Sequence, residues 1–328
     1  MEKEMEKEME KEMEKGTEKT IKRIHFCGGD KGGVGKTFFC KILIDYYENL
    51  DIPITIYDLD KTNKDIYNSG SYHNLKRNRR KIKIKGSYFS DNPELMDKAD
   101  EIIYALLEGK HDVIVNLPAG SSAQMERWWE RNNCAELIPA QGCMACHWIL
   151  LNGENFDRAE RSILKALMDI VLVRNLYLRS NWDTINDLME KQLQNIKNSL
   201  QEEYKLRIVE NIKIINLESL SKSVSDILSL KKLLIKDSYQ TSDLKLLDRQ
   251  KLISFTKTMY KILEKTGKLP VIDSDISQKS FSNYQDEDEF ENNQDEDEFE
   301  NTEDIEIENE YKDMEDIEKE ELQNTNEN

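Results

Sequence analysis

The sequence has no run of about 18 apolar residues, the length that a membrane-spanning helix needs. Its N-terminus has no apolar core, so a secretory signal is not expected either. Cysteine is scarce: five residues among 328, an odd number, do not suggest a disulfide framework. These absences exclude a membrane-embedded protein and a disulfide-stabilised secreted domain from the expected classes.

Basic residues are outnumbered by acidic ones, 47 to 65, but the acidic excess lies at the two ends of the chain. Residues 273–328 hold 24 acidic and 3 basic residues, and residues 1–15 hold 7 and 4. The remaining chain therefore has 40 basic and 34 acidic residues, a net charge of +6. A mildly basic body leaves binding to a polyanion open.

Both ends of the chain are low in complexity. Residues 1–19 begin with a Met-Glu-Lys-Glu repeat of period four, typical of a fraying helix or a disordered tail. Residues 271–328 form an acidic tail in which Gln285–Asn292 recurs almost at once as Gln294–Asn301, a duplication with a nine-residue period. Such a segment has too few apolar residues to fold, so we expect one folded domain over residues 20–270.

The acidic tail has two interpretations. It either keeps the protein soluble, or it folds back on a basic segment and competes with DNA for it. Because it is acidic, it does not resemble the basic amphipathic helix that attaches proteins to membranes. No membrane partner is therefore expected.

A glycine-rich stretch, Cys-Gly-Gly-Asp-Lys-Gly-Gly-Val-Gly-Lys-Thr, ends at Thr37. It follows an apolar-leaning run, Ile21–Cys27, and leads into a predicted helix that ends near Asn49. Strand, glycine-rich turn and helix are the context of a phosphate-binding loop. Backbone N–H groups and the helix N-terminus would face the phosphates, Lys36 would add a charge, and the Thr37 hydroxyl would ligate Mg²⁺. The residues expected to bind the cofactor are Gly32, Gly33, Val34, Gly35, Lys36 and Thr37.

The segment Lys31–Thr37, Lys-Gly-Gly-Val-Gly-Lys-Thr, resembles the deviant Walker A motif of the ParA/MinD family, although Asp30 occupies the usual position of the first glycine. Members of that family are ATPases that dimerise around two nucleotides. The resemblance implies ATP and Mg²⁺ as cofactors and a nucleotide-dependent homodimer in which Lys31 contacts the partner's ATP. With a nucleotide loop, the few unpaired cysteines favour a cytoplasmic protein.

Two aspartates, Asp58 and Asp60, follow a predicted strand at Pro53–Tyr57. This places both carboxylates at the carboxyl edge of a parallel sheet, where α/β proteins bind ligands. By resemblance to the family's switch segment, Asp60 positions the attacking water and Asp58 lies near Mg²⁺. The alternative is a polar loop with two solvated aspartates.

The segment from Asp112 to Gly120 reads as an apolar strand and a turn, and it resembles the family's Walker B region. Where the family usually has an aspartate, this chain has Asn116. An amide accepts a hydrogen bond from a magnesium-bound water, but it carries no charge. We therefore expect a slow ATPase or, alternatively, a nucleotide-binding adaptor with little or no hydrolysis.

Asn175 ends another apolar run, Asp169–Asn175, which reads as a buried strand. By resemblance it is a candidate for recognising adenine. The alternative is an asparagine that caps the next turn.

Seven of the ten residues from Lys76 to Lys85 are basic. Such a cluster is typical of salt-sensitive binding to DNA of any sequence. The alternation of lysines with Ile82 and Ile84 is equally typical of an edge strand whose charges oppose aggregation. The two interpretations are compatible.

Cys143-Met-Ala-Cys-His147 matches the haem attachment pattern of c-type cytochromes, and with Cys134 it holds residue types that bind zinc. A well-spaced second ligand pair is missing. We expect instead a strand at Ala135–Pro139 and a turn that leads into a helix.

The other apolar patterns predict helices from Asn92 to about Glu108, around 185–200 and at 243–265, and a strand at 212–216. We therefore expect an α/β fold with a mostly parallel sheet and helices on both faces, like P-loop NTPases. Within the family, Asp-x-Asp-x-x-Asn with Asn-Leu-Pro-Ala-Gly is similar to ParA-like proteins of plasmid partition, maintenance or conjugal transfer. That implies a ParB-like or transfer-complex partner. A ligase or reductase of the same fold would need a substrate pocket or cluster-binding cysteines.

Overall fold

The computed structural model describes residues 21–61, 64–67, 82–153, 168–178, 182–199, 212–239 and 241–271. By its internal contacts the chain divides into two units, Met1–Ser280 and Phe281–Asn328. All described residues belong to the first unit.

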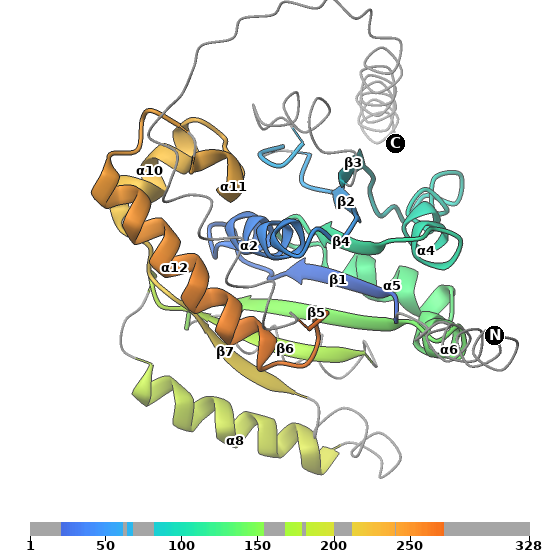
Figure 1. Cartoon of the computed structure of the whole chain (residues 1–328). Helices are drawn as coiled ribbons and strands as arrows, with labels where there is room; N and C mark the ends of the chain where they lie inside the picture. The colour runs from blue at the N-terminus through green and yellow to red at the C-terminus, as the bar shows by residue number, and fades with distance from the viewer. Residues whose placement is uncertain are drawn as a thin grey trace, which may run out of the picture. The chain divides into compact units, whose positions relative to one another are not determined.

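A seven-stranded sheet forms the centre of the described part of the chain, in the order β3-β2-β4-β1-β5-β6-β7 (Figure 1). Every pair of neighbouring strands is parallel, which confirms the predicted fold class. The strands are β1 (Arg23–Gly28), β2 (Ile54–Asp58), β3 (Ile82–Gly86), β4 (Asp112–Asn116), β5 (Met144–Leu151), β6 (Asp169–Asn175) and β7 (Lys213–Leu217).

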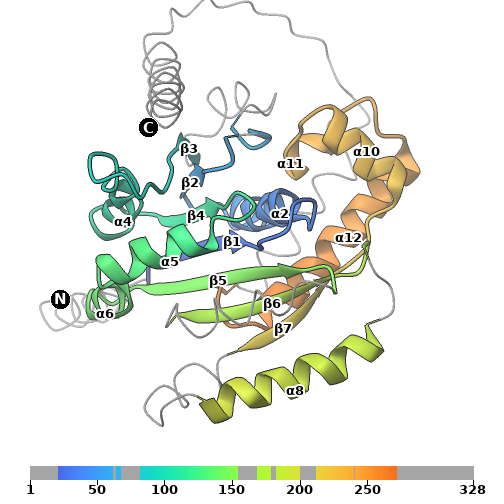
Figure 2. The same cartoon turned by 180° about the vertical axis from the view of Figure 1, so that it is seen from behind.

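Helices cover both faces of the sheet, as the two opposite views show (Figures 1 and 2). One face carries α2 (Lys36–Asn49) and α12 (Leu246–Glu264), with α10 (Lys222–Leu230) and α11 (Ile235–Ser238) beside them. The other face carries α4 (Asp100–Leu107), α5 (Ser122–Arg131), α6 (Cys134–Ala140) and α8 (Asp183–Ser199).

Large aromatic and aliphatic side chains pack between the sheet and the helices of the second face, which carries α4, α5, α6 and α8. Phe26 of β1 packs edge-on against Trp129 of α5, with ring centroids 5.8 Å apart. Further along the sheet, Ile149 and Leu172 pack against Met189 of α8. Because side chains alternate across a strand, these residues mark one face, and His25 and Trp148 face α2 on the other.

The element predictions near the phosphate loop are confirmed. The helix after the loop ends at Asn49, and the strand that ends in Asn175 has the predicted bounds. The final helix spans Leu246–Glu264, within three residues of its predicted ends.

Three predictions of secondary structure are wrong. Ala135–Pro139 lies in the helix α6 rather than in a strand, and the predicted helix after Cys143 is the strand β5. A strand buried on both faces reads as a continuous apolar run, so periodicity could not distinguish the two. The helix predicted from Asn92 begins only at Asp100, because residues 92–99 form short turns such as Leu95 N–H to Asn92 C=O, 3.0 Å.

No helix among the described residues is long and apolar enough to cross a membrane.

Candidate functional site

The glycine-rich loop joins β1 to α2 at the carboxyl edge of the sheet, next to the ends of β2 and β4. Gly35 is the residue before α2 and has φ = 98°, a left-handed conformation that glycine adopts without strain. A Cβ atom there would lie 2.7 Å from the amide nitrogen of Asn175. Both the backbone angle and the lack of space therefore require glycine at this position.

Lys36, the first residue of α2, folds back over the loop. Its Nζ donates a hydrogen bond to the Lys31 carbonyl oxygen, 3.1 Å away, and the side chain is buried. Burial lowers the pKa of Lys36, and the nearby Asp60 and Asp30 oppose that shift. The ammonium group is thus held at the loop, where a phosphate would meet it.

A cavity of about 610 Å³ opens beside the loop. It brings together residues that are far apart in the sequence: the loop, the segment after β2, the turn after β4 and the α10–α11 region. Its lining includes the predicted Lys36, Thr37 and Asp60, together with Gly32, Gly33, Gly35, Phe38, Lys41, Asp65, Pro118, Ala119, Leu228, Ser229, Leu233 and Ile235.

Asp58 and Asn116 lie side by side at the ends of β2 and β4, where they are paired in register. The Asn116 amide donates to Asp58 Oδ1 at 2.9 Å, and the backbone N–H of Tyr67 donates to Oδ2 at 3.1 Å. Burial nevertheless raises the pKa of Asp58 to about 6, because these hydrogen bonds only partly offset the loss of water. The oxygen of the amide side chain, Asn116 Oδ1, is buried and accepts no hydrogen bond from the described residues.

Oxygen donors of the kind that Mg²⁺ and its bound water prefer occur at this edge of the sheet. The Thr37 hydroxyl belongs to a residue that lines the cavity, and the Asp58 carboxylate and the unused Asn116 Oδ1 are buried at the ends of β2 and β4. Only one of the two side chains at the strand ends is a carboxylate, so the site has one negative charge fewer than a pair of aspartates would supply.

Asn175 contacts the loop directly. Its amide nitrogen donates to the Val34 carbonyl oxygen at 2.9 Å, and its Oδ1 accepts from the backbone N–H of Tyr177 at 3.0 Å. The residue thus joins β6 to the loop, and both its amide groups are hydrogen-bonded. Recognition of adenine by Asn175 stays a prediction.

Two further residues belong to the site and were not predicted. Ser122, at the start of α5, donates a hydrogen bond to Asp30, the residue that replaces the first glycine of the loop. Lys41, one turn after Thr37, lines the cavity. A charged residue within the apolar run from Phe38 to Ile44 is a signal in the sequence that could have revealed Lys41, whereas the Ser122 contact depends on the tertiary fold.

The basic segment lies partly outside the described residues, which begin again at Ile82. From there β3 is an edge strand of the sheet, with Ile84 buried and Lys83 and Lys85 exposed. The predicted edge strand is therefore present, and DNA binding by residues 76–85 stays a prediction.

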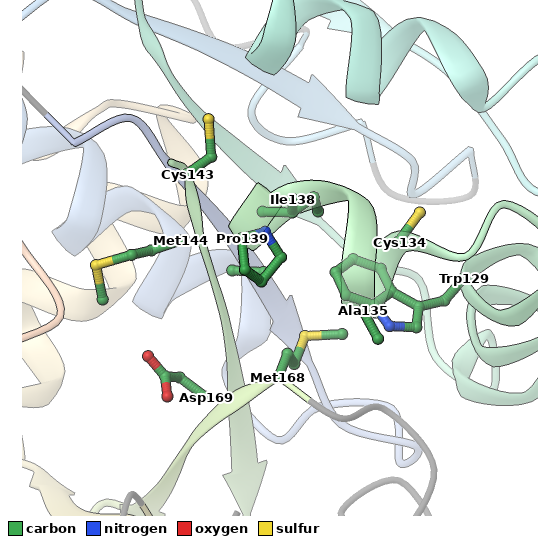
Figure 3. Close-up of a pocket in the computed structure, with 10 residues that line it drawn as sticks. Trp129, Cys134, Ala135, Ile138, Pro139, Cys143, Met144, Met168 and Asp169 are labelled. Carbon is green, nitrogen blue, oxygen red and sulfur yellow. The ribbon is translucent and has the colours of Figure 1, made fainter. Parts of the chain in front are cut away.

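Cys143, Met144 and Ala145 lie at the amino end of β5 and line a cavity of about 180 Å³ (Figure 3). The His147 side chain is not part of that lining and lies beside Gly28, at the end of β1. Cys134 and Cys143 lie on opposite sides of Ile138 and Pro139 in that view. Burial raises the pKa of Cys134 to about 12 and lowers that of His147 to about 4. Within the described residues no group of three or more His, Cys, Asp or Glu side chains could hold a metal ion.

No protein-family model and no curated protein matches the chain. Several solved structures are similar to it. A nucleotide-binding protein from Archaeoglobus fulgidus, in complex with ADP, is 17% identical over 68% of this chain and 90% of its own, with a TM-score of 0.38. A chain of the MinC:MinD cell division complex from Aquifex aeolicus is 16% identical over 77% of this chain and 99% of its own, with a TM-score of 0.41.

The pNOB8 ParA protein, bound to nonspecific DNA, is 12% identical over 75% of this chain and 99% of its own, with a TM-score of 0.37. At such identities the likeness concerns the fold alone. In the described part of the chain, the Lys31–Thr37 loop lies between β1 and α2 of an all-parallel sheet, which is the context of a phosphate-binding loop.

Proposed function

We propose that this protein is an ATP-dependent switch that dimerises around bound nucleotide and hydrolyses ATP slowly. ATP binds at Gly32–Thr37, and Lys36 contacts its outer phosphates. Lys31 is exposed on the loop, which suits a contact with the nucleotide of a second protomer. Asp60 orients the attacking water, and hydrolysis separates the protomers.

The observation that carries the proposal is the shared cavity of Lys36, Thr37 and Asp60. A group that anchors phosphate, a hydroxyl that ligates a metal and a carboxylate that orients water are the parts that phosphoryl transfer needs in one place. They come from two elements, α2 and the segment after β2, that only the fold brings together.

Magnesium, when bound, would neutralise charge on the phosphates, and Thr37, Asp58 and Asn116 would hold it. The chain's own residues position the groups that would contact the nucleotide. Lys36 stays fixed over the loop by its bond to Lys31, and Asp58 is held in place by Asn116.

The process that we propose for this switch is DNA or plasmid partition, maintenance or transfer in the cytoplasm. The positive charge of residues 16–272 and the lysines of β3 favour DNA or a protein partner of ParB type over a membrane. The exposed charges of the edge strand would contact phosphates without reading the base sequence.

Sizing by light scattering with ATP, with ADP and without nucleotide tests the switch. Wild type should be dimeric with ATP only. Lys36→Ala should stay monomeric because it loses the phosphate contact, and Lys31→Ala should bind ATP without dimerising. Lys213→Ala, which removes an exposed lysine of β7, is the matched control. A dimer of Lys36→Ala with ATP would count against the proposal.

A second candidate function is a nucleotide-gated adaptor that barely hydrolyses ATP. The neutral Asn116, whose amide is hydrogen-bonded to Asp58, favours it. ATPase rates of wild type and Asn116→Asp distinguish the two: activity that appears only in the variant supports the adaptor, and activity in wild type supports the enzyme.

A further inference from the structure

Lys41 is the sixth residue of the helix α2, four positions after Thr37. Four residues of an α-helix span about 6 Å, and helical side chains lean toward the N-terminus of their helix. The long side chain of Lys41 therefore extends back toward Thr37 and the loop. In agreement with this, Lys41 lines the same cavity as Lys36 and Thr37.

Among the described residues, no counter-ion is in contact with the ammonium group of Lys41. The residue is only 6% exposed, and no hydrogen bond or ion pair to a described residue holds it. Asp65 and Asp58 are close enough to raise its pKa, but burial outweighs them and lowers it. Burial of most of the side chain disfavours the charged form, and the ammonium group reaches the cavity that Lys41 lines, so a favourable contact is expected there in another state of the protein.

Lys36 and Lys41 place two ammonium groups in the cavity, whose lining also holds the carboxylates of Asp60 and Asp65. Asn116 takes away one negative charge where a carboxylate would attract Mg²⁺, and Lys41 adds one positive charge inside the cavity. Both changes weaken the attraction for a divalent cation, and both strengthen the attraction for a phosphate chain that carries no metal.

We propose that Lys41 is a second cationic ligand of the nucleotide phosphates and that, with Asn116, it lets the site hold ATP without magnesium. The inference rests on the proposed nucleotide site and deepens it: the loop, Lys36 and Lys41 together supply the charge that a metal ion would otherwise provide. Lys41 binds the phosphate chain directly, as an ammonium group does through charge-assisted hydrogen bonds.

Calorimetric titration of the full chain with ATP, in EDTA and in excess Mg²⁺, tests the inference. Wild type should bind ATP in EDTA within about threefold of its affinity with Mg²⁺. Lys41→Met should bind metal-free ATP about tenfold or more weakly, the size expected for one lost charge-assisted hydrogen bond. Asn116→Asp should bind ATP more tightly in excess Mg²⁺ than in EDTA. Lys213→Met should bind ATP as wild type does in both conditions.

The stability of the nucleotide-free protein separates ligand binding from a structural role. Methionine has a similar length and no charge, so Lys41→Met should unfold at the same or a higher urea concentration than wild type. A lower urea midpoint together with unchanged affinity for metal-free ATP would assign Lys41 to the fold and overturn the inference.

Two outcomes of the ATP titrations of wild type are equally decisive. Wild type that binds ATP only with Mg²⁺ overturns the inference and leaves the nucleotide site intact. Wild type that binds ATP in neither condition overturns the proposed function itself, and the inference with it.

Discussion

At the residue scale, the carboxyl group of Asp58 is buried and accepts a hydrogen bond from the Asn116 amide, which partly replaces its lost hydrogen bonds to water. The pKa of Asp58 rises from 3.8 to about 6 in the folded protein, so the fold favours its neutral form. Ionisation therefore costs stability: the penalty is absent below pH 3.8, grows as pH rises to about 6 and is constant above it. From the shift its size is on the order of 3 kcal/mol.

This pair predicts a pH-dependent difference between wild type and Asp58→Asn. The free energy of unfolding of wild type should fall relative to that of the variant as pH rises from 4 to 6, because only wild type ionises a carboxyl group there. Urea unfolding at a series of pH values measures the slope. Asp226→Asn, an exposed position on α10, is the control. Parallel curves for wild type and Asp58→Asn would contradict the raised pKa.

At the scale of elements, a chain of buried hydrogen bonds ties α2 to three strands. Trp148 of β5 donates to His25 Nδ1 at 3.2 Å, so the His25 proton is on Nε2, which donates to the Tyr47 hydroxyl at 2.8 Å. Tyr47 in turn donates to Asp112 Oδ2 at 2.7 Å. Burial lowers the pKa of His25 to about 3, so the imidazole stays neutral and the arrangement of donors persists at neutral pH.

Tyr47→Phe should destabilise the fold by about 1–3 kcal/mol, because it leaves a buried N–H donor and a carboxylate oxygen without their shared partner. Chemical denaturation at pH 7 measures this loss, and Tyr104→Phe, at an exposed tyrosine of α4, is the control. Equal midpoints for Tyr47→Phe and wild type would show that the hydrogen bonds add nothing to the docking of α2.

At the scale of the whole molecule, the acidic residues 273–328 and the basic body have opposite charge. If the tail competes with DNA for the basic segment, its deletion should strengthen DNA binding at low salt, and added salt should reduce the difference. Binding to a labelled duplex measures this, with a tail of equal length and neutral composition as the control. Equal affinity with and without the tail would support a solubilising role alone.

Local sequence was enough to predict the loop, since glycines, Lys36 and Thr37 act within one short segment that joins a strand to a helix. It was also enough for the ends of β2, β4 and β6, where polar residues interrupt apolar runs at Asp58, Asn116 and Asn175. For β5 it failed, because the strand between β1 and β6 is buried on both sides and has no alternating pattern.

The sequence by itself thus determined the prediction of a nucleotide-binding loop, because that chemistry depends on residue type and short spacing. Only the tertiary structure decided which of them meet: it pairs Asn116 with Asp58, joins Asn175 to Val34 and leaves Lys41 buried in the cavity of the loop. The reason is that parallel strands bring their carboxyl ends together from segments far apart in the chain, and sheet order is a long-range property.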